Sequence, residues 1–159
     1  MNTIGFDAHD HTHCIADTMQ SAEALCAEKG LRFTPVRRRV LELLLAEHRA
    51  MGAYDILEVL SAEGLGSQPP VAYRALEFLV KNGLAHRVEG LNAYAACAHL
   101  GTSHAPAFLI CRSCQLVAEV NGDELSAALE TEAAKSGFRI ERVAVELVGQ
   151  CPSCVGKAA

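Results

Sequence analysis

Residues 69–96 read PPVAYRALEFLVKNGLAHRVEGLNAYAA, and the predicted fold follows from this stretch. Its two leading prolines suit the first turn of a helix, and the Asn-Gly pair at residues 82–83 is a typical helix end. Two short strand-like runs, residues 84–88 and 92–96, come next around a turn and predict a β-hairpin. The stretch therefore predicts one helix followed at once by two antiparallel strands.

Toward the N-terminus, apolar residues recur at helical spacing in three further segments. We expect helices over residues 18–29, from Pro35 onward, and over residues 53–63, with Thr34 as an N-cap. Cys26 falls on the apolar stripe of the first helix and is predicted to be a core residue. Short helices followed by a hairpin are the layout of a winged helix-turn-helix, although generic helical domains show a similar pattern.

Residues 1–16 show no apolar periodicity and are predicted to form a flexible His-rich tail. The tail contains four possible metal ligands, His9, His11, His13 and Cys14. These side chains could scavenge metal, whereas most tracts of this kind are solvated chain ends.

Beyond residue 105 the pattern changes to that of a small α/β unit. Strands are expected over residues 107–110 and 116–120, a helix over residues 123–135, and a long β-branched strand over residues 138–148. A unit of this size buries too little apolar surface to be stable without a staple or a partner.

Two C-x-x-C pairs lie within this C-terminal unit. They are formed by Cys111, Cys114, Cys151 and Cys154. Each pair places two thiolates on one tight turn, and four sulfurs complete the tetrahedral shell of a structural zinc ion. A redox role for one C-x-x-C pair is disfavoured, because the pair does not lie in a thioredoxin-like βαβ pattern. The shell has no open position, so the predicted zinc stabilises the fold and does not catalyse a reaction.

A second group of possible ligands spans the junction between the hairpin and the C-terminal unit. It comprises His86, Cys97, His99, His104 and Glu119. A shell of two nitrogens, one sulfur and one carboxylate suits zinc better than calcium or magnesium. Taken singly, these residues also read as a surface histidine, a buried thiol and a strand-face carboxylate.

The composition limits the function classes. The formal net charge is −5, which argues against a general nucleic-acid coat or a polybasic membrane binder. Residues 20–90 are neutral overall and contain the run Arg37-Arg38-Arg39, so a reader of DNA with one small basic face remains possible. Seven cysteines without a visible leader or long apolar run predict a cytoplasmic metal-binding protein with no membrane partner. No H-E-x-x-H motif is present, so neither a zinc hydrolase nor a small organic substrate is expected.

Several motifs together carry a family resemblance. They are LRFTPVR at 31–37, AYDIL at 53–57, PPVAYRALEFL at 69–79, HRVE at 86–89 and the two C-x-x-C pairs. With these motifs the sequence resembles the Fur superfamily of metal-responsive transcription regulators, and most closely its zinc branch, Zur. The fourth helix departs from the family pattern, because it reads Pro-Val-Ala-Tyr-Arg where the family usually has a Thr-Val-Tyr-Arg core.

The resemblance implies an α+β chain with a winged-helix DNA-binding domain over residues 17–98 and a zinc-stapled α/β dimerisation domain over residues 99–159. It also implies a homodimer on inverted-repeat operator DNA, with about two zinc ions per subunit. The structural zinc would use the four C-x-x-C cysteines. The regulatory zinc would use His86, Cys97, His104 and Glu119, with His99 as a possible substitute.

The implied function is that of a zinc-responsive repressor of zinc-uptake genes. Its candidate DNA contacts are Tyr54, Tyr73, Arg74, Arg37 and Arg38. Tyr73 could instead pack under its helix, and an arginine run is most often a solvated face in which at least one member forms an internal ion pair. The alternatives are an iron- or peroxide-sensing regulator and, from a different class, a zinc buffer or chaperone.

Overall fold

The computed structural model describes residue 6 and residues 11–157, which divide into two compact units. Of the described residues, the first unit holds 11–101 and the second holds residue 6 and residues 102–157. The sequence places the domain boundary after residue 98, whereas the compact units divide after Gly101.

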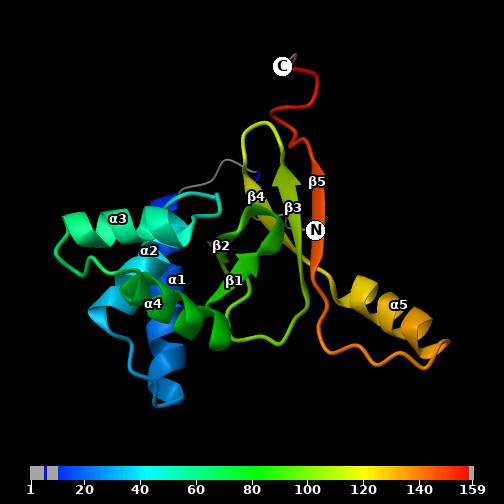
Figure 1. Cartoon of the computed structure of the whole chain (residues 1–159), viewed down its shortest axis with the longest axis horizontal. Coiled ribbons are helices and arrows are strands. Elements are labelled where there is room, and N and C mark those ends of the chain that lie inside the picture. The colour runs from blue at the N-terminus through cyan, green and yellow to red at the C-terminus, as the bar shows by residue number, and fades with distance from the viewer. Residues whose placement is uncertain (1–5, 7–10, 158–159) are drawn as a thin grey trace. The chain divides into compact units, whose positions relative to one another are not determined.

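The first unit contains four helices and a hairpin (Figure 1). Its elements are α1 (His11–Glu28), α2 (Pro35–Ala46), α3 (Ala53–Ala62), α4 (Pro69–Lys81), β1 (Ala85–Val88), the 3₁₀ turn η1 (Glu89–Leu91) and β2 (Ala93–Ala96). This is the predicted winged-helix layout.

Helix α1 begins earlier than the sequence analysis predicts. Residues 11–16, assigned there to the flexible tail, form its first turns, whereas His9 lies outside the described residues. The reason is that Ile15 extends the apolar stripe of Met19, Ala22 and Cys26 by one helical turn and packs against the core. Cys26 is fully buried in that core, as predicted.

The helix boundaries follow from local chemistry. Thr34 accepts a hydrogen bond from the backbone N–H of Arg37 at 3.3 Å and caps α2, whose first residue is Pro35. At the end of α4, Asn82 is followed by Gly83 with a φ of +72°, a left-handed conformation that glycine adopts without steric cost. These caps confirm the signals identified in the sequence.

Helices α2, α3 and α4 pack around one apolar core. Leu41 of α2, Ile56 of α3 and Leu76 of α4 are fully buried there. The hairpin is attached to this core through Leu84 and Ala85, which are also fully buried. The core therefore determines how α4 and the hairpin are presented to solvent.

The hairpin pairs Ala85 with Ala96 and Val88 with Ala93. Its turn places Asn92 in the left-handed region, which asparagine tolerates better than most residues. Met51 and Tyr94 form an isolated antiparallel bridge that adds the segment before α3 to the hairpin.

The second unit is a small sheet followed by a helix and a returning strand (Figure 1). Its elements are β3 (Pro106–Cys111), β4 (Val117–Asn121), α5 (Asp123–Ala134) and β5 (Val145–Gly149). The strand order is β4-β3-β5, with β3 antiparallel to β4 and parallel to β5.

The last strand is shorter than the predicted run over residues 138–148. β5 begins at Val145, which pairs with Ala107 of β3. The ladder with β5 stops there because the preceding residue of β3, Pro106, has no N–H to donate. The β-branched residues that precede Val145 therefore have no strand partner among the described residues.

Helix α5 has an apolar side but no buried residue. Leu125 and Leu129 are both exposed, and Figure 1 shows α5 extending from one end of the sheet instead of covering its face. None of the helices in the described part of the chain is long and apolar enough to cross a membrane.

Leu76→Ala should destabilise the protein by about 2–5 kcal/mol, because it leaves a cavity in a site with no solvent exposure. Val80→Ala on the same helix is the matched control, since Val80 is 37% exposed and should lose little. Urea unfolding followed by circular dichroism measures both changes. Equal losses in the two variants would contradict this description of the core.

Candidate metal centres and DNA-facing surface

The four C-x-x-C cysteines lie together in the second unit. Their Sγ atoms are all within 4.8 Å of one another, and those of Cys114 and Cys151 are 3.7 Å apart. A tetrahedral zinc ion with Zn–S bonds of about 2.3 Å requires neighbouring sulfurs about 3.8 Å apart. All seven cysteines of the chain are free thiols, so the cluster is not held by a disulfide. The donor set and its spacing fit zinc.

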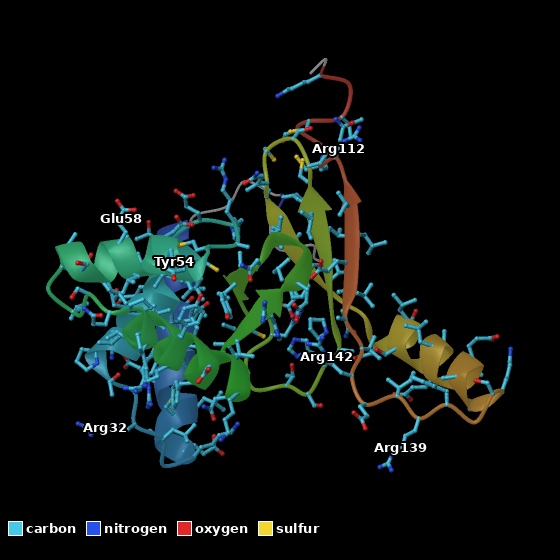
Figure 2. The ribbon with its side chains drawn as sticks, in the orientation of Figure 1. Arg32, Tyr54, Glu58, Arg112, Arg139 and Arg142 are labelled. Atoms are coloured by element: carbon cyan, nitrogen blue, oxygen red, sulfur yellow. The ribbon has the colours of Figure 1, made fainter. Side chains whose placement is uncertain are left out.

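The cluster joins two strand ends. Cys111 is the last residue of β3, and β3 pairs through it with Gly149 at the end of β5. Gln115 adopts a φ of +61° in the tight turn that follows Cys114. Figure 2 shows sulfur atoms gathered at this end of the sheet, near the labelled Arg112. The pairing of β3 with β5 is what brings together two C-x-x-C pairs that lie far apart in the sequence.

The surroundings of Cys111 and Cys154 shift the pKa values of these two thiols in opposite directions. The backbone N–H of Cys151 donates to Cys111 Sγ at 3.3 Å, and this hydrogen bond is the main cause that lowers the pKa of Cys111 to about 6. Contact with the neighbouring sulfurs, first that of Cys151, raises the pKa of Cys154 to about 12. One thiolate is thus available near neutral pH, and a bound cation would favour ionisation of the other thiols.

His104 and Glu119 form a buried pair in the second unit. His104 Nε2 lies 2.7 Å from Glu119 Oε1, and the two side chains are 8% and 4% exposed. His104 Nδ1 is 2.9 Å from the carbonyl oxygen of Thr102. A carbonyl oxygen only accepts, so Nδ1 carries the proton and Nε2 is the nitrogen available to a metal.

His86 and Cys97 form a second pair, in the first unit. The N–H of Cys97 donates to the carbonyl of Leu84 at 3.0 Å, which extends the hairpin ladder by one residue. Because side chains alternate along a strand, Cys97 opposite Leu84 shares a face of the hairpin with His86. A ring nitrogen of His86 lies within 4.8 Å of Cys97 Sγ.

His99 acts on Cys97 through its backbone. Its N–H donates to Cys97 Sγ at 3.3 Å. The role of the His99 side chain as a substitute ligand stays a prediction.

The predicted DNA contacts include three exposed side chains of the first unit. Tyr54 on α3 is 69% exposed, and Tyr73 in the first half of α4 is 39% exposed, so Tyr73 is not packed fully beneath its helix. Figure 2 labels Tyr54 on α3. Arg74 is also exposed and makes no hydrogen bond or ion pair within the described chain. These side chains are available for contact with a nucleic acid.

The arginine run is more involved in internal contacts than a solvated face would be. Arg39 makes a two-bonded contact with Glu63, with Nη2–Oε1 at 2.7 Å and Nε–Oε2 at 2.8 Å. Its hydrogen bond lowers the pKa of the Glu63 carboxyl. This confirms the expected ion pair, which links α2 to the end of α3.

The other two arginines also contact neighbouring segments. Arg38 pairs with Glu23 of α1. Arg37 donates to the carbonyl of Arg32, and its guanidinium carbon lies 3.7 Å from the ring centre of Phe78 on α4. Contact of Arg37 and Arg38 with DNA phosphates stays a prediction.

The sequence analysis did not single out the residues that hold His104 in place. Asp123 Oδ1 accepts from the backbone N–H of Ala105 at 2.8 Å, and Gly122 N–H donates to the Ala105 carbonyl at 2.8 Å. The sequence does contain a signal for this attachment: Asn-Gly-Asp at residues 121–123 is a typical helix start, whose polar groups are available to bind a neighbouring segment.

The fold and the thiol cluster define a winged-helix protein with four clustered cysteines that could hold a metal ion. The model of the ferric uptake regulator family matches residues 28–148, and the chain belongs to this family.

Two curated relatives and two solved structures are similar to most of the chain. The zinc uptake regulation protein of Escherichia coli (strain K12) is 37% identical over 141 residues, which are 87% of this chain and 82% of the relative. The peroxide operon regulator of Bacillus subtilis (strain 168) is 24% identical over 142 residues, 89% of this chain and 97% of the relative. Both relatives are named as regulators and not as enzymes.

The first structure is a zinc uptake regulator complexed with zinc and DNA, with a TM-score of 0.84 and 35% identity over 89% of this chain and 95% of that one. The second is the crystal structure of holo XcZur, with a TM-score of 0.80 and 34% identity over 89% of this chain and 99% of that one.

Cys114→Ser should remove zinc from the four-cysteine cluster and unfold much of the second unit, because three thiolates leave the shell incomplete. Metal analysis of the purified protein and its thermal unfolding measure the effect. The matched control is Cys26→Ala, which removes a thiol from the core of the first unit and should keep the full zinc content. Unchanged zinc content in Cys114→Ser would contradict the assignment.

Proposed function

We propose that the chain is a zinc-responsive transcriptional repressor that binds palindromic operator DNA as a zinc-loaded homodimer and controls zinc-uptake genes. The observation that carries this proposal is its similarity, over 89% of its length, to a zinc uptake regulator complexed with zinc and DNA. Family membership and the 37% identity to the zinc uptake regulation protein support it.

The proposed DNA-reading element is α4. In a helix-turn-helix the N-terminal part of the second helix reaches base edges in the major groove. Tyr73 and Arg74 lie near the start of α4 and are exposed there. Arg74 has the geometry to bind guanine with two hydrogen bonds, and Tyr73 can contact phosphate, sugar or a thymine methyl. Tyr54 on α3, with Arg37 and Arg38, would add contacts to the backbone.

The proposed metal content is two zinc ions per subunit. The structural ion would bind Cys111, Cys114, Cys151 and Cys154, whose spacing fits a closed tetrahedron. The regulatory ion would take two ligands from each unit. Those ligands are His86 and Cys97 from the first unit and His104 and Glu119 from the second.

This ligand set explains how zinc would control DNA binding. A regulatory ion shared by the two units would tie the DNA-reading unit to the dimer body. Two reading heads must enter successive major grooves at a fixed spacing, so limiting their freedom strengthens binding to an inverted repeat. A coupling of about 1–3 kcal/mol changes affinity about 5- to 150-fold, and operator DNA must then tighten zinc binding by the same factor.

The proposal includes no catalytic activity and places the protein in the cytoplasm. Both proposed zinc shells are full, whereas a catalytic zinc keeps an open position for water or substrate. A reducing compartment keeps seven cysteines available as ligands and out of disulfides.

We expect operator binding to rise with buffered free zinc and to fall steeply with added salt, because phosphate contacts release counterions. Fluorescence anisotropy of a labelled inverted-repeat duplex measures both dependences, and iron(II) titrated in place of zinc is the comparison. Binding that ignores zinc would overturn the proposal. Binding that responds to iron(II) alone would favour the iron- or peroxide-sensing alternative.

Arg74→Ala should weaken operator binding by about 1–3 kcal/mol per lost base contact while zinc content stays intact. The matched control is Lys81→Ala, which removes one positive charge from the opposite end of the same helix and should change the affinity less. Unaltered operator affinity in Arg74→Ala would contradict the proposed base contact, whereas loss of operator binding with zinc content intact would argue against a zinc buffer or chaperone.

A further inference from the structure

The proposed zinc ligand His104 is held by the start of α5. Residues 102–105 lie at the start of this stretch of the second unit and have no regular secondary structure, so contacts with other elements must fix the backbone around His104. Ala105, the residue that follows His104, provides these contacts. Both backbone polar groups of Ala105 are hydrogen-bonded to the first residues of α5, through Asp123 and Gly122.

Asp123 makes the side-chain half of this attachment. Its Oδ1 accepts the Ala105 N–H at 2.8 Å, and that N–H belongs to the peptide bond that joins His104 to Ala105. Asp123 is itself oriented, because its backbone N–H donates to Asn121 Oδ1 at 2.8 Å. Asn121 lies at the end of β4, opposite Pro106. The carboxylate therefore links the His104 segment to a rigid strand end.

Gly122 makes the backbone half and leaves no space for a side chain. Its N–H donates to the Ala105 carbonyl at 2.8 Å. A Cβ at this position would lie 2.8 Å from that same carbonyl oxygen and 3.3 Å from Ala107 Cβ. The carbonyl belongs to a backbone already fixed by Asp123, so a methyl group here would displace the segment that carries His104.

These contacts also set the direction of the His104 ring. The ring is held at Nδ1 by the Thr102 carbonyl, its Nε2 lies 2.7 Å from Glu119 Oε1, and the backbone after it is held by Asp123 and Gly122. Groups that orient a metal ligand without touching the metal typically change metal affinity about 10- to 100-fold when removed.

We propose that Asp123 is a positioning residue for His104, and that the start of α5 thereby sets the affinity of the regulatory zinc site. The inference rests on the proposed function, because it takes His104 as a ligand of that zinc. The proposal also gives α5 a role in the response to metal. Zinc bound at His104 would stabilise the hydrogen bonds between Ala105 and the start of α5, and by reciprocity those hydrogen bonds would strengthen zinc binding.

The test compares variants of the full chain that all retain the structural zinc. Asp123→Ala removes the acceptor, and we expect the affinity for the second zinc to fall about tenfold or more in competition with a chelator. Asp123→Asn keeps an oxygen that can accept the Ala105 N–H and should restore most of the affinity. Gly122→Ala displaces the next peptide, between Ala105 and Pro106, by steric contact with the Ala105 carbonyl, and it should also weaken zinc binding.

The matched control is Glu124→Ala, which removes the other carboxylate from the first turn of α5. It should bind zinc as the unaltered chain does. Cobalt(II) bound in place of the regulatory zinc supplies a spectroscopic readout, because its absorption reports thiolate ligation and coordination geometry. We expect a changed spectrum in Asp123→Ala and an unchanged one in Glu124→Ala.

Unaltered zinc affinity in Asp123→Ala would overturn the inference. Equal losses in Asp123→Ala and either Asp123→Asn or Glu124→Ala would also overturn it, because they would reveal an effect of charge alone. A failure of the proposed function is distinguishable: His104→Ala would then leave the second zinc affinity unchanged, whatever the Asp123 variants do.

Discussion

The second unit depends on the attachment between the ends of β3 and β5. Its sheet has three short strands, its helix buries no residue, and two of the four clustered cysteines belong to its small buried core. Folded units of about this size commonly need a metal or a disulfide, and the thiols here are all free. The proposed zinc at the four-cysteine cluster would supply the missing stability by closing the long loop that contains β4 and α5.

The first unit is organised differently, because its stability comes from an apolar core and its surface is left for recognition. Contacts of the arginine run reinforce the helix packing: Arg39 joins α2 to α3, and Arg37 stacks on Phe78 of α4. An acidic chain can read DNA under these conditions, since few basic groups are needed if the helix that carries them is held rigidly. Within the proposed function, the regulatory zinc would extend this rigidity to the second unit.

Much of the fold was predictable because its signals are local. Thr34 and Gly83 mark helix ends through short-range hydrogen bonds and backbone conformation, and the hairpin follows from two strand-like runs around a turn. The start of α1 was missed because the polar run before Ile15 hides one apolar residue at helical spacing. The last strand was predicted too long, because strand propensity does not reveal where the partner strand ends. The structural cluster was recognisable from two C-x-x-C pairs, whereas the Asp123 attachment was not.

The sequence alone determined the residue types that carry the chemistry: the paired thiols, the histidines and carboxylate between them, and the aromatic and basic start of α4. These are properties of the side chains and of spacings within a helical turn or a tight turn. The tertiary structure decided which distant groups meet. It brought Cys111 beside Cys151 through parallel strand pairing, and it placed Asp123 on the peptide after His104. The physical reason is that the choice of a distant partner strand and the docking of a helix depend on the packing of the whole unit, whereas the pattern within one segment reports only its own faces and ends.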